Sequence, residues 1–295
     1  MTQRTTLITG VTQGMGRALA LDLAPRGGTL LLHGRDPDRL AAVAAEARAA
    51  SGPGTTIRTY LADLSDLDQV HAMAARIRAA EPHLDGLIHN AVAGGGERPL
   101  VRELSRQGHE LRFAVNHVAP YALTRALLPL LRASAPARVV NVASIGQEAI
   151  DFDDVMLERD YEGLRAYCRS KLAMIMATFE LAAELRGTGV TVNALHPAHL
   201  MDTPGVRAYG LTPAVGTQEG VRPTVRLLLD PETATVTGRY FDRFTEARAH
   251  EQAYDAGARQ RLMALTHRLI GLEYGAAGRA AAPVVKTGCP DRRAR

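Results

Sequence analysis

The segment Thr5–Gly16, which reads TTLITGVTQGMG, decides the fold. Its first five residues are apolar or β-branched and predict a buried strand, and the apolar spacing after Gly14 predicts a helix over 14–25. Glycines between a strand and a helix let backbone amides approach a phosphate at the positive end of that helix. Many such turns need glycine for geometry alone. In this strand–turn–helix context, we interpret the segment as the first unit of a dinucleotide-binding domain.

The rest of the chain repeats the alternation of apolar strands and longer helical stretches. Further strands are predicted at 29–33, 56–61, 84–89, 138–144, 190–195 and, briefly, 239–241, and helices at 36–50, 65–80, 105–132 and 161–186. Asp36 precedes Pro37 at a helix start, and Ser65 is the expected cap of the following helix. Apolar strands separated by helices predict a parallel sheet covered on both faces. We therefore expect a single Rossmann-type, doubly wound α/β sheet of about seven strands.

The sequence divides into three parts. Residues 1–245 are the expected catalytic domain, with a substrate lid at 199–222. Residues 246–272 lie in an amphipathic stretch, predicted as one helix over 245–271, that packs on the domain or serves an oligomer contact. Residues 273–295 are rich in Gly, Ala, Pro and Arg and are expected to form a flexible basic tail.

Composition narrows the function classes. The chain has 295 residues, of which 46% are hydrophobic and 22% charged, as in ordinary globular proteins. No apolar run is long enough to cross a membrane, and no signal-peptide pattern is present. The two cysteines give no disulfide framework, so we expect a cytoplasmic protein. The ten histidines show no metal-ligand spacing, and no metal site is predicted.

The net charge of +4 invites a nucleic-acid hypothesis, but the charge is uneven. Residues 243–295 carry a net charge of +5, which leaves −1 for residues 1–242. Aromatic residues make up only 4% of the chain, too few for a base-stacking platform. The near-neutral body therefore argues against a nucleic-acid partner.

Polar motifs follow the predicted strands in a fixed order. They are Asp63-Leu64, Asn90-Ala91, Asn116 in the next helix, Ser144, the pair Tyr167 and Lys171 in a YxxxK motif, and Asn193 with Pro197. Each lies at the carboxyl end of a strand or on the adjoining helix, where an open α/β sheet binds its ligands. Together with the TGxxxGxG turn, this order resembles the short-chain dehydrogenase/reductase superfamily over roughly residues 5–245.

Tyr167 and Lys171 are one helical turn apart and share a face. A free tyrosine has a pKa near 10, and a lysine cation beside it is expected to lower that pKa. The resemblance implies that Tyr167 exchanges a proton with the substrate oxygen and that Ser144 donates a hydrogen bond to the carbonyl. It also implies that Asn116 holds a water in a proton relay behind Lys171.

The resemblance also implies a set of cofactor contacts. The residues it marks are Gly10, Thr12, Gln13, Gly14, Met15 and Gly16 in the turn, Arg35, Asp63 and Leu64 at the adenine, Asn90 and Ala91, then Tyr167, Lys171, Pro197 and Thr203 near the nicotinamide. An NAD enzyme usually places a carboxylate at the tip of the second strand. That position holds Arg35, whose planar fork suits a 2′-phosphate. We therefore expect NADP(H) in preference to NAD(H), the alternative being that Arg35 only covers the adenine.

The spacing of 23 residues between Ser144 and Tyr167 resembles the branch of retinol dehydrogenases and WW-domain oxidoreductases. The DFDDV segment at 151–155 and the segments at 113–131 and 167–174 support that branch. The resemblance does not imply that this chain acts on a retinoid.

Three departures from the family pattern lie near the expected nicotinamide. Val92 replaces a glycine, Ala198 replaces another, and Thr203 comes one residue late.

The lid is mainly apolar, which favours a hydrophobic ketone or alcohol, for example a polyketide-like natural product. The segment Gly94–Gly96 with Glu97 and Arg98 is a candidate pocket wall. The leading hypothesis is thus an NADPH-dependent carbonyl reductase or alcohol dehydrogenase. The alternatives are a dehydratase, an epimerase or a catalytically silent cofactor-binding scaffold of the same fold. The resemblance further implies a homodimer or homotetramer built through the helices near 105–132 and 161–187.

Overall fold

The computed structural model describes residues 4–94 and 101–272. One sheet of eight strands has the order β3-β2-β1-β4-β5-β6-β7-β8. The strands are β1 (Thr5–Thr9), β2 (Gly28–Gly34), β3 (Thr55–Leu61), β4 (Gly86–His89), β5 (Ala137–Val142), β6 (Val190–His196), β7 (Tyr240–Asp242) and β8 (Thr245–Glu246). All neighbours pair in parallel except β7 and β8, which form an antiparallel edge. The prediction of a doubly wound sheet is confirmed, with one more strand than expected.

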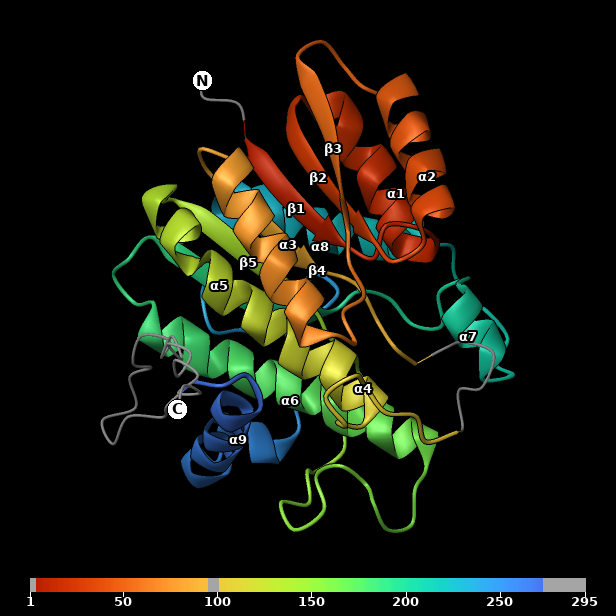
Figure 1. Cartoon of the computed structure of the whole chain (residues 1–295), viewed down its shortest axis with the longest axis vertical. Helices are drawn as coiled ribbons and strands as arrows, with labels where there is room; N and C mark the ends of the chain where they lie inside the picture. The colour runs from red at the N-terminus through yellow and green to blue at the C-terminus, as the bar shows by residue number, and fades with distance from the viewer. Residues whose placement is uncertain (1–3, 95–100, 273–295) are drawn as a thin grey trace, which may run out of the picture.

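Helices cover both faces of this sheet (Figure 1). Those of ordinary length are α1 (Gly14–Leu23), α2 (Pro37–Ala49), α3 (Leu67–Ala80), α5 (Ala119–Ala133), α6 (Gly163–Glu184), α8 (Gln218–Leu229) and α9 (Ala256–Leu269); α4 (Leu111–Phe113) and α7 (Pro204–Ala208) are short. Helices α3, α5 and α6 pack with Leu7, Leu87 and Val139 on one face, while α1, α2 and α8 pack with Ile8, Ile88 and Val140 on the other. Alternate side chains of each central strand therefore enter two separate cores, as a sheet buried on both faces requires.

The long helix predicted from Ser105 begins later, at Leu111. Gly108 has a positive φ of 81°, a bridge pairs Leu104 with Glu110, and the Glu110 carboxylate caps the helix by accepting a hydrogen bond from the Phe113 amide at 2.7 Å. The segment then continues through a π-helical turn, η2 (Ala114–Val118), into α5. The apolar period correctly predicted the helical structure after Leu111, but it did not predict the turn that the bridge closes.

Two other expectations were wrong in detail. Asp66, not Ser65, caps α3, because its carboxylate accepts a hydrogen bond from the Asp68 amide at 3.0 Å. Residues 218–222, at the end of the expected lid, start helix α8, whose Val221 is fully buried. The expected cap at Asp36 is confirmed by a 3.0 Å hydrogen bond from the Arg39 amide.

The predicted carboxyl-terminal helix is broken into β8, the 3-10 turn η4 (Glu251–Tyr254) and α9. Asp255 separates η4 from α9 and caps α9 by accepting hydrogen bonds from the amides of Gly257 and Ala258. The residues 273–295, expected to be a flexible tail, lie outside the described part of the chain.

Helix α9 packs on the domain rather than standing free. His117 of η2 contacts Thr266 at 2.8 Å, Tyr121 of α5 contacts His267 at 2.6 Å, and Arg259 pairs with Glu180 of α6. These contacts cover part of the surface of α5 and α6 that the sequence suggested for an oligomer contact. An assembly through that surface would have to accommodate α9.

Replacing Leu87 with alanine tests the two-sided core. Leu87 is fully buried in β4 between β1 and β5. Leu87→Ala should lower the free energy of unfolding by about 2–5 kcal/mol, because a buried cavity replaces the side chain. Leu61→Ala is the control, since Leu61 is 45% exposed at the end of edge strand β3. Urea denaturation measures both, and equal losses would contradict the packing described.

Candidate functional site

The glycine turn after β1 is packed against the loop after β4. A Cβ on Gly10, whose φ is +71°, would lie 2.6 Å from Ala91 Cα. A Cβ on Gly16 would lie 2.0 Å from the Gly10 carbonyl oxygen and 2.5 Å from Asn90 Nδ2. No side chain fits at either place, so both glycines are required by close approach and, at Gly10, by backbone conformation.

The Asn90 side chain ties these loops together. Its Nδ2 donates to the carbonyls of Thr9 and Gly10 at 3.0 Å each, and the Thr9 hydroxyl accepts hydrogen bonds from the amides of Asn90 and Ala91. Asn90 therefore holds the shape of the glycine turn, and the direct contact of Ala91 with Gly10 brings these predicted cofactor residues together.

The amino-terminal end of α1 is open to a ligand. Gln13 occupies the cap position with extended backbone and no capping side-chain bond, and the first turn carries no acidic residue. A Cβ on Gly14 would lie 3.2 Å from Thr203 Cγ2, so the residue predicted near the carboxamide lies beside the turn. Met15 is buried beneath, 4% exposed, and only its backbone can face a phosphate. The geometry suits a pyrophosphate on backbone amides.

His33 was not predicted as part of this site. At the end of β2, its Nδ1 accepts a hydrogen bond from the Gly10 amide at 3.2 Å, and its Nε2 lies 3.0 Å from the Ala62 carbonyl. Burial lowers its pKa to about 4, so the ring is neutral and Nε2 carries the proton. A polar residue ending the otherwise apolar run TLLLH was the available signal.

The expected adenine end is formed by the tips of β2 and β3. Arg35 is exposed directly after β2 and has no side-chain hydrogen bond or ion pair with the described residues. Asp63 accepts a hydrogen bond from the Ser65 amide at 2.8 Å, while Leu64 is 5% exposed and packs in the core. Arg35 is thus free to meet a ligand, whereas Leu64 can offer only its backbone.

Tyr167 and Lys171 lie on one face of α6, with Lys171 Nζ 5.8 Å from the centroid of the Tyr167 ring. Lys171 is 2% exposed and donates to the Val142 carbonyl at 2.7 Å. Ser144, in the loop after β5, has its backbone carbonyl held by the Tyr240 hydroxyl at 2.9 Å, a contact that sequence reasoning missed. The structure brings the predicted Ser144, Tyr167 and Lys171 together.

The expected lowering of the pKa of Tyr167 is not found in this state. Burial raises the pKa of Tyr167 to about 12, although the Ser144 hydroxyl acts in the opposite direction. Burial also lowers the pKa of Lys171 to about 7, so at neutral pH its side chain is only partly charged. Burial dominates the pKa of both groups, and this is why the expected lowering of the Tyr167 pKa is absent.

Asn116 sits in the π-helical turn η2 and is fully buried. Its Oδ1 accepts a hydrogen bond from the Ala93 amide, and its Nδ2 donates to the Ala93 carbonyl at 2.8 Å and to Ser170 Oγ at 2.9 Å. The Ser170 hydroxyl in turn donates to the Tyr167 carbonyl at 2.7 Å. Asn116 therefore connects the β4 loop to the backbone of Tyr167, and π turns often occur at functional sites.

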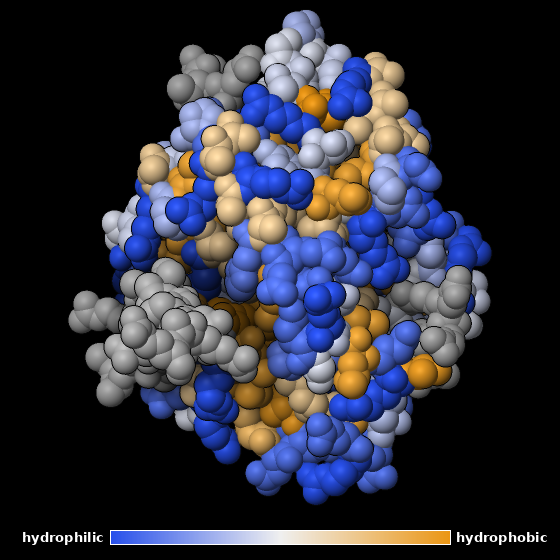
Figure 2. Space-filling view, in the orientation of Figure 1, coloured by the Kyte–Doolittle hydropathy of each residue, from blue (hydrophilic) through white to orange (hydrophobic). Residues whose placement is uncertain are grey.

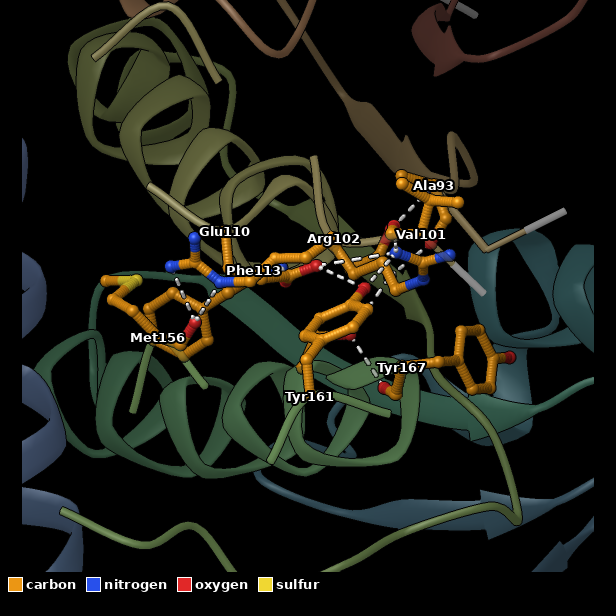
Figure 3. A network of polar contacts seen from close by, with 11 residues as sticks. Ala93, Val101, Arg102, Glu110, Phe113, Met156, Tyr161 and Tyr167 are labelled. Atoms are coloured by element: carbon orange, nitrogen blue, oxygen red, sulfur yellow. Dashed lines mark hydrogen bonds and ion pairs between the residues drawn. The ribbon is translucent and has the colours of Figure 1, made fainter. Parts of the chain in front are cut away.

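A second polar network adjoins this one (Figure 3). Glu110 accepts a hydrogen bond from the Tyr161 hydroxyl at 3.2 Å, and Arg112 Nη1 contacts the same hydroxyl. Figure 3 shows the Tyr161 side chain pointing toward Glu110, so Tyr161 is a member of this polar network. Arg112, one of two charged residues in the mainly apolar segment 111–131, was the sequence signal for this network.

Exposed apolar side chains come from segments that adjoin the site residues. The fold exposes large apolar side chains at Val92 (51%), Ile145 (56%), Leu164 (48%) and Leu211 (47%), each from a segment that adjoins the predicted residues. The face shown in Figure 2 is by contrast a mosaic in which hydrophilic residues separate smaller apolar areas. Among the departures from the family pattern, Val92 thus adds accessible apolar bulk, whereas Ala198 is 5% exposed.

The other candidate groups give less support for a functional role. Within residues 4–94 and 101–272, no cluster of His, Cys, Asp or Glu side chains could hold a metal, and no helix is long and apolar enough to cross a membrane. Burial, with Glu148 and Glu162, raises the pKa of the Cys168 thiol to about 11, which disfavours a nucleophilic role. Of the candidate pocket wall, Gly94 packs on the Tyr167 ring, and residues 95–98 lie outside the described residues.

Curated relatives cover nearly the whole chain. Human retinol dehydrogenase 13 is 35% identical over 291 residues, which span 92% of this chain and 85% of that protein. Human dehydrogenase/reductase SDR family member 13 is 36% identical over 287 residues, or 92% of this chain and 74% of that protein. The predicted resemblance to the retinol-dehydrogenase branch is confirmed.

Solved structures agree on the architecture. An uncharacterised protein from Mycobacterium paratuberculosis is 28% identical, covers 93% of this chain and 96% of its own, and has a TM-score of 0.74. A short-chain dehydrogenase from Escherichia coli CFT073, complexed with NADPH, is 27% identical with a TM-score of 0.63, covering 83% of this chain and 98% of its own. The family model for short chain dehydrogenases matches residues 4–210. The chain therefore belongs to the short-chain dehydrogenase family and is an oxidoreductase of CH–OH and C=O groups.

Proposed function

We propose that the protein is an NADPH-dependent carbonyl reductase, or the reverse alcohol dehydrogenase, for hydrophobic small molecules. The observation that carries the proposal is the grouping of Ser144, Tyr167 and Lys171 in a fold whose glycine turn leads into a helix without a side-chain cap. Fold alone would not assign this chemistry, because the same architecture hosts many reactions.

The residues present fit a nicotinamide dinucleotide. The uncapped first turn of α1 suits the pyrophosphate, and exposed Arg35 is available to a 2′-phosphate. Asn90 and Ala91 border the turn, and Thr203 lies beside Gly14 where the carboxamide is expected. A bound nicotinamide supplies or accepts the hydride, and the protein supplies orientation and electrostatics. The NADPH bound to the Escherichia coli relative supports the same choice of cofactor.

The proton transfer is assigned to Tyr167. Ser144 and the phenol together offer hydrogen bonds to a substrate oxygen, and the phenol gives up its proton as that oxygen becomes an alcohol. Formation of the phenolate then depends on Lys171, because a positive charge on Lys171 Nζ would favour the phenolate. Asn116 fixes the backbone at Tyr167 through Ser170, and we assign the water of a proton relay to the space between Asn116 and Lys171.

The substrate class follows from the rim of the site. Apolar side chains exposed beside a polar catalytic group mark the binding place of an apolar ligand rather than a phosphorylated one. Val92, Ile145 and Leu211 supply this surface. A ketone on a polyketide-like natural product meets the requirement.

Replacing Tyr167 by phenylalanine tests the catalytic assignment. Tyr167→Phe should reduce kcat for ketone reduction by about 100-fold or more, since it removes the proton donor but keeps the ring. NADPH binding, measured by nucleotide fluorescence, should change little. Tyr254→Phe is the matched control, because the Tyr254 hydroxyl accepts a hydrogen bond only from the Ala249 amide among the described residues. Full activity in Tyr167→Phe would refute the assignment.

Reversing the charge at Arg35 tests the cofactor. Arg35→Glu should weaken NADPH binding by about 10- to 100-fold, the worth of a lost charge-assisted hydrogen bond, while NADH binding changes far less. Arg48→Glu makes the same change at the other end of α2, where Arg48 Nη2 approaches the Ile57 carbonyl at 3.5 Å. Titration calorimetry with both nucleotides gives the constants. A wild type that binds NADH more tightly than NADPH would remove the proposed role of Arg35.

The lowered pKa of Lys171 predicts a pH-dependent stability without nucleotide. Above pH 7 the folded protein releases the Lys171 proton, while the unfolded chain, with an ordinary lysine pKa of 10.5, retains it. Stability should therefore rise by about 1–2 kcal/mol from pH 7 to 8.5. Lys171→Met should largely remove the rise in urea denaturation curves. An identical rise in the variant would show that other groups cause it.

A further inference from the structure

Two buried hydrogen-bond donors in the second polar network lack acceptors. The Arg112 Nε and the Tyr209 hydroxyl are both shielded from solvent, and neither has a hydrogen bond of normal geometry, although the Tyr209 hydroxyl interacts with the Arg112 side chain. The Arg112 side chain is only 3% exposed. Leaving a buried polar group unpaired costs about 1–3 kcal/mol, so two such groups in one place point to a ligand that pairs them.

The opposite edge of the guanidinium is already held. Arg112 Nη1 contacts the Tyr161 hydroxyl, lies 3.4 Å from the Val101 carbonyl and lies 3.5 Å from Glu110 Oε1. Glu110 is 1% exposed, and its second oxygen caps α4 through the Phe113 amide. These contacts fix the orientation of Arg112 and balance its charge, while the Nε edge is left for another partner.

This open edge lies near the catalytic tyrosine. Arg112 is four residues before Asn116 in the same helical segment, and Asn116 reaches Tyr167 through Ser170. Tyr209 follows α7 in the lid. Its hydroxyl raises the pKa of Arg112 against the effect of burial, and it adds to the larger effect of burial in raising the pKa of Tyr167. The Tyr209 hydroxyl is therefore close to both groups.

We propose that Arg112 and Tyr209 together bind a second carbonyl oxygen of the substrate, and that preferred substrates are ketones with another carbonyl a few bonds from the reacting one. The inference rests on the proposed reductase function and names its substrate class. A carbonyl oxygen has two lone pairs and accepts from both Nε–H and the phenol. Because Glu110 already balances Arg112, a neutral oxygen fits, whereas a carboxylate would bring an uncompensated charge into a buried place.

Matched substrate pairs test this proposal. Ethyl 3-oxohexanoate and ethyl 4-oxohexanoate have the chain lengths of 4-nonanone and 3-nonanone, which lack the second carbonyl. The wild type should show a kcat/KM at least about tenfold higher for one of the keto esters than for its matched ketone, as expected of one well-made buried hydrogen bond. Tyr209→Phe should reduce that ratio about tenfold, and the control Tyr254→Phe should keep it.

A second variant covers the other donor. Arg112→Met combined with Glu110→Gln avoids leaving a buried charge without its partner, and it should also reduce the ratio. A ratio near one in the wild type, or one that survives both Tyr209→Phe and the double variant, overturns the second oxygen site alone. A preference for the free acid 4-oxohexanoate over its ethyl ester would contradict the proposal that the second bound oxygen is neutral. Absence of NADPH turnover with all of these compounds removes the reductase function together with this inference.

Discussion

The site depends on the close contact between the loops that follow β1 and β4. Asn90 donates from one amide nitrogen to the carbonyls of Thr9 and Gly10, and no Cβ fits at Gly10 or Gly16. This contact sets the path of the glycine turn and hence the direction of the first amides of α1. His33 adds a neutral acceptor for the Gly10 amide from the neighbouring strand. The geometry that we propose for phosphate binding is therefore a property of three strands of the sheet, not of the glycine motif alone.

The β4 loop is also connected to α6, the helix that carries Tyr167. Asn116 binds both the amide and the carbonyl of Ala93, and its remaining donor reaches Ser170, which bonds the carbonyl of Tyr167. Buried polar groups that are all satisfied in this way stabilise one arrangement over others. Arg112 and Tyr209 differ in retaining unpaired donors, and this contrast within one region distinguishes groups that hold the fold from groups available to a ligand.

Much of this could be predicted from the sequence, because the deciding features are local. The run TTLIT matches β1 residue for residue, and Asp36 with Pro37 marked the start of α2. The apolar period did not reveal three features: the short turn closed by the Leu104–Glu110 bridge, which delays α4, the two-residue antiparallel strand β8, and the packing that makes 218–222 part of α8. Likewise Tyr167, Lys171 and Ser144 are visible as a motif, but the pKa of Tyr167 depends on burial, which no spacing reveals. Glu110, Arg112 and Tyr209 belong to no motif, and only the fold brings them together.

We propose that a nicotinamide cofactor bound at this site transfers a hydride to a carbonyl carbon of the substrate. The most direct measurement is the isotopic content of the alcohol formed from 4-nonanone or ethyl 3-oxohexanoate with NADPH carrying deuterium in the transferred position. Mass spectrometry should find one deuterium on the carbinol carbon with wild-type protein and a product yield far lower with Tyr167→Phe. Product formed without deuterium at that carbon, or substrate altered without oxidation of NADPH, would contradict the account and favour a non-reductive member of the family.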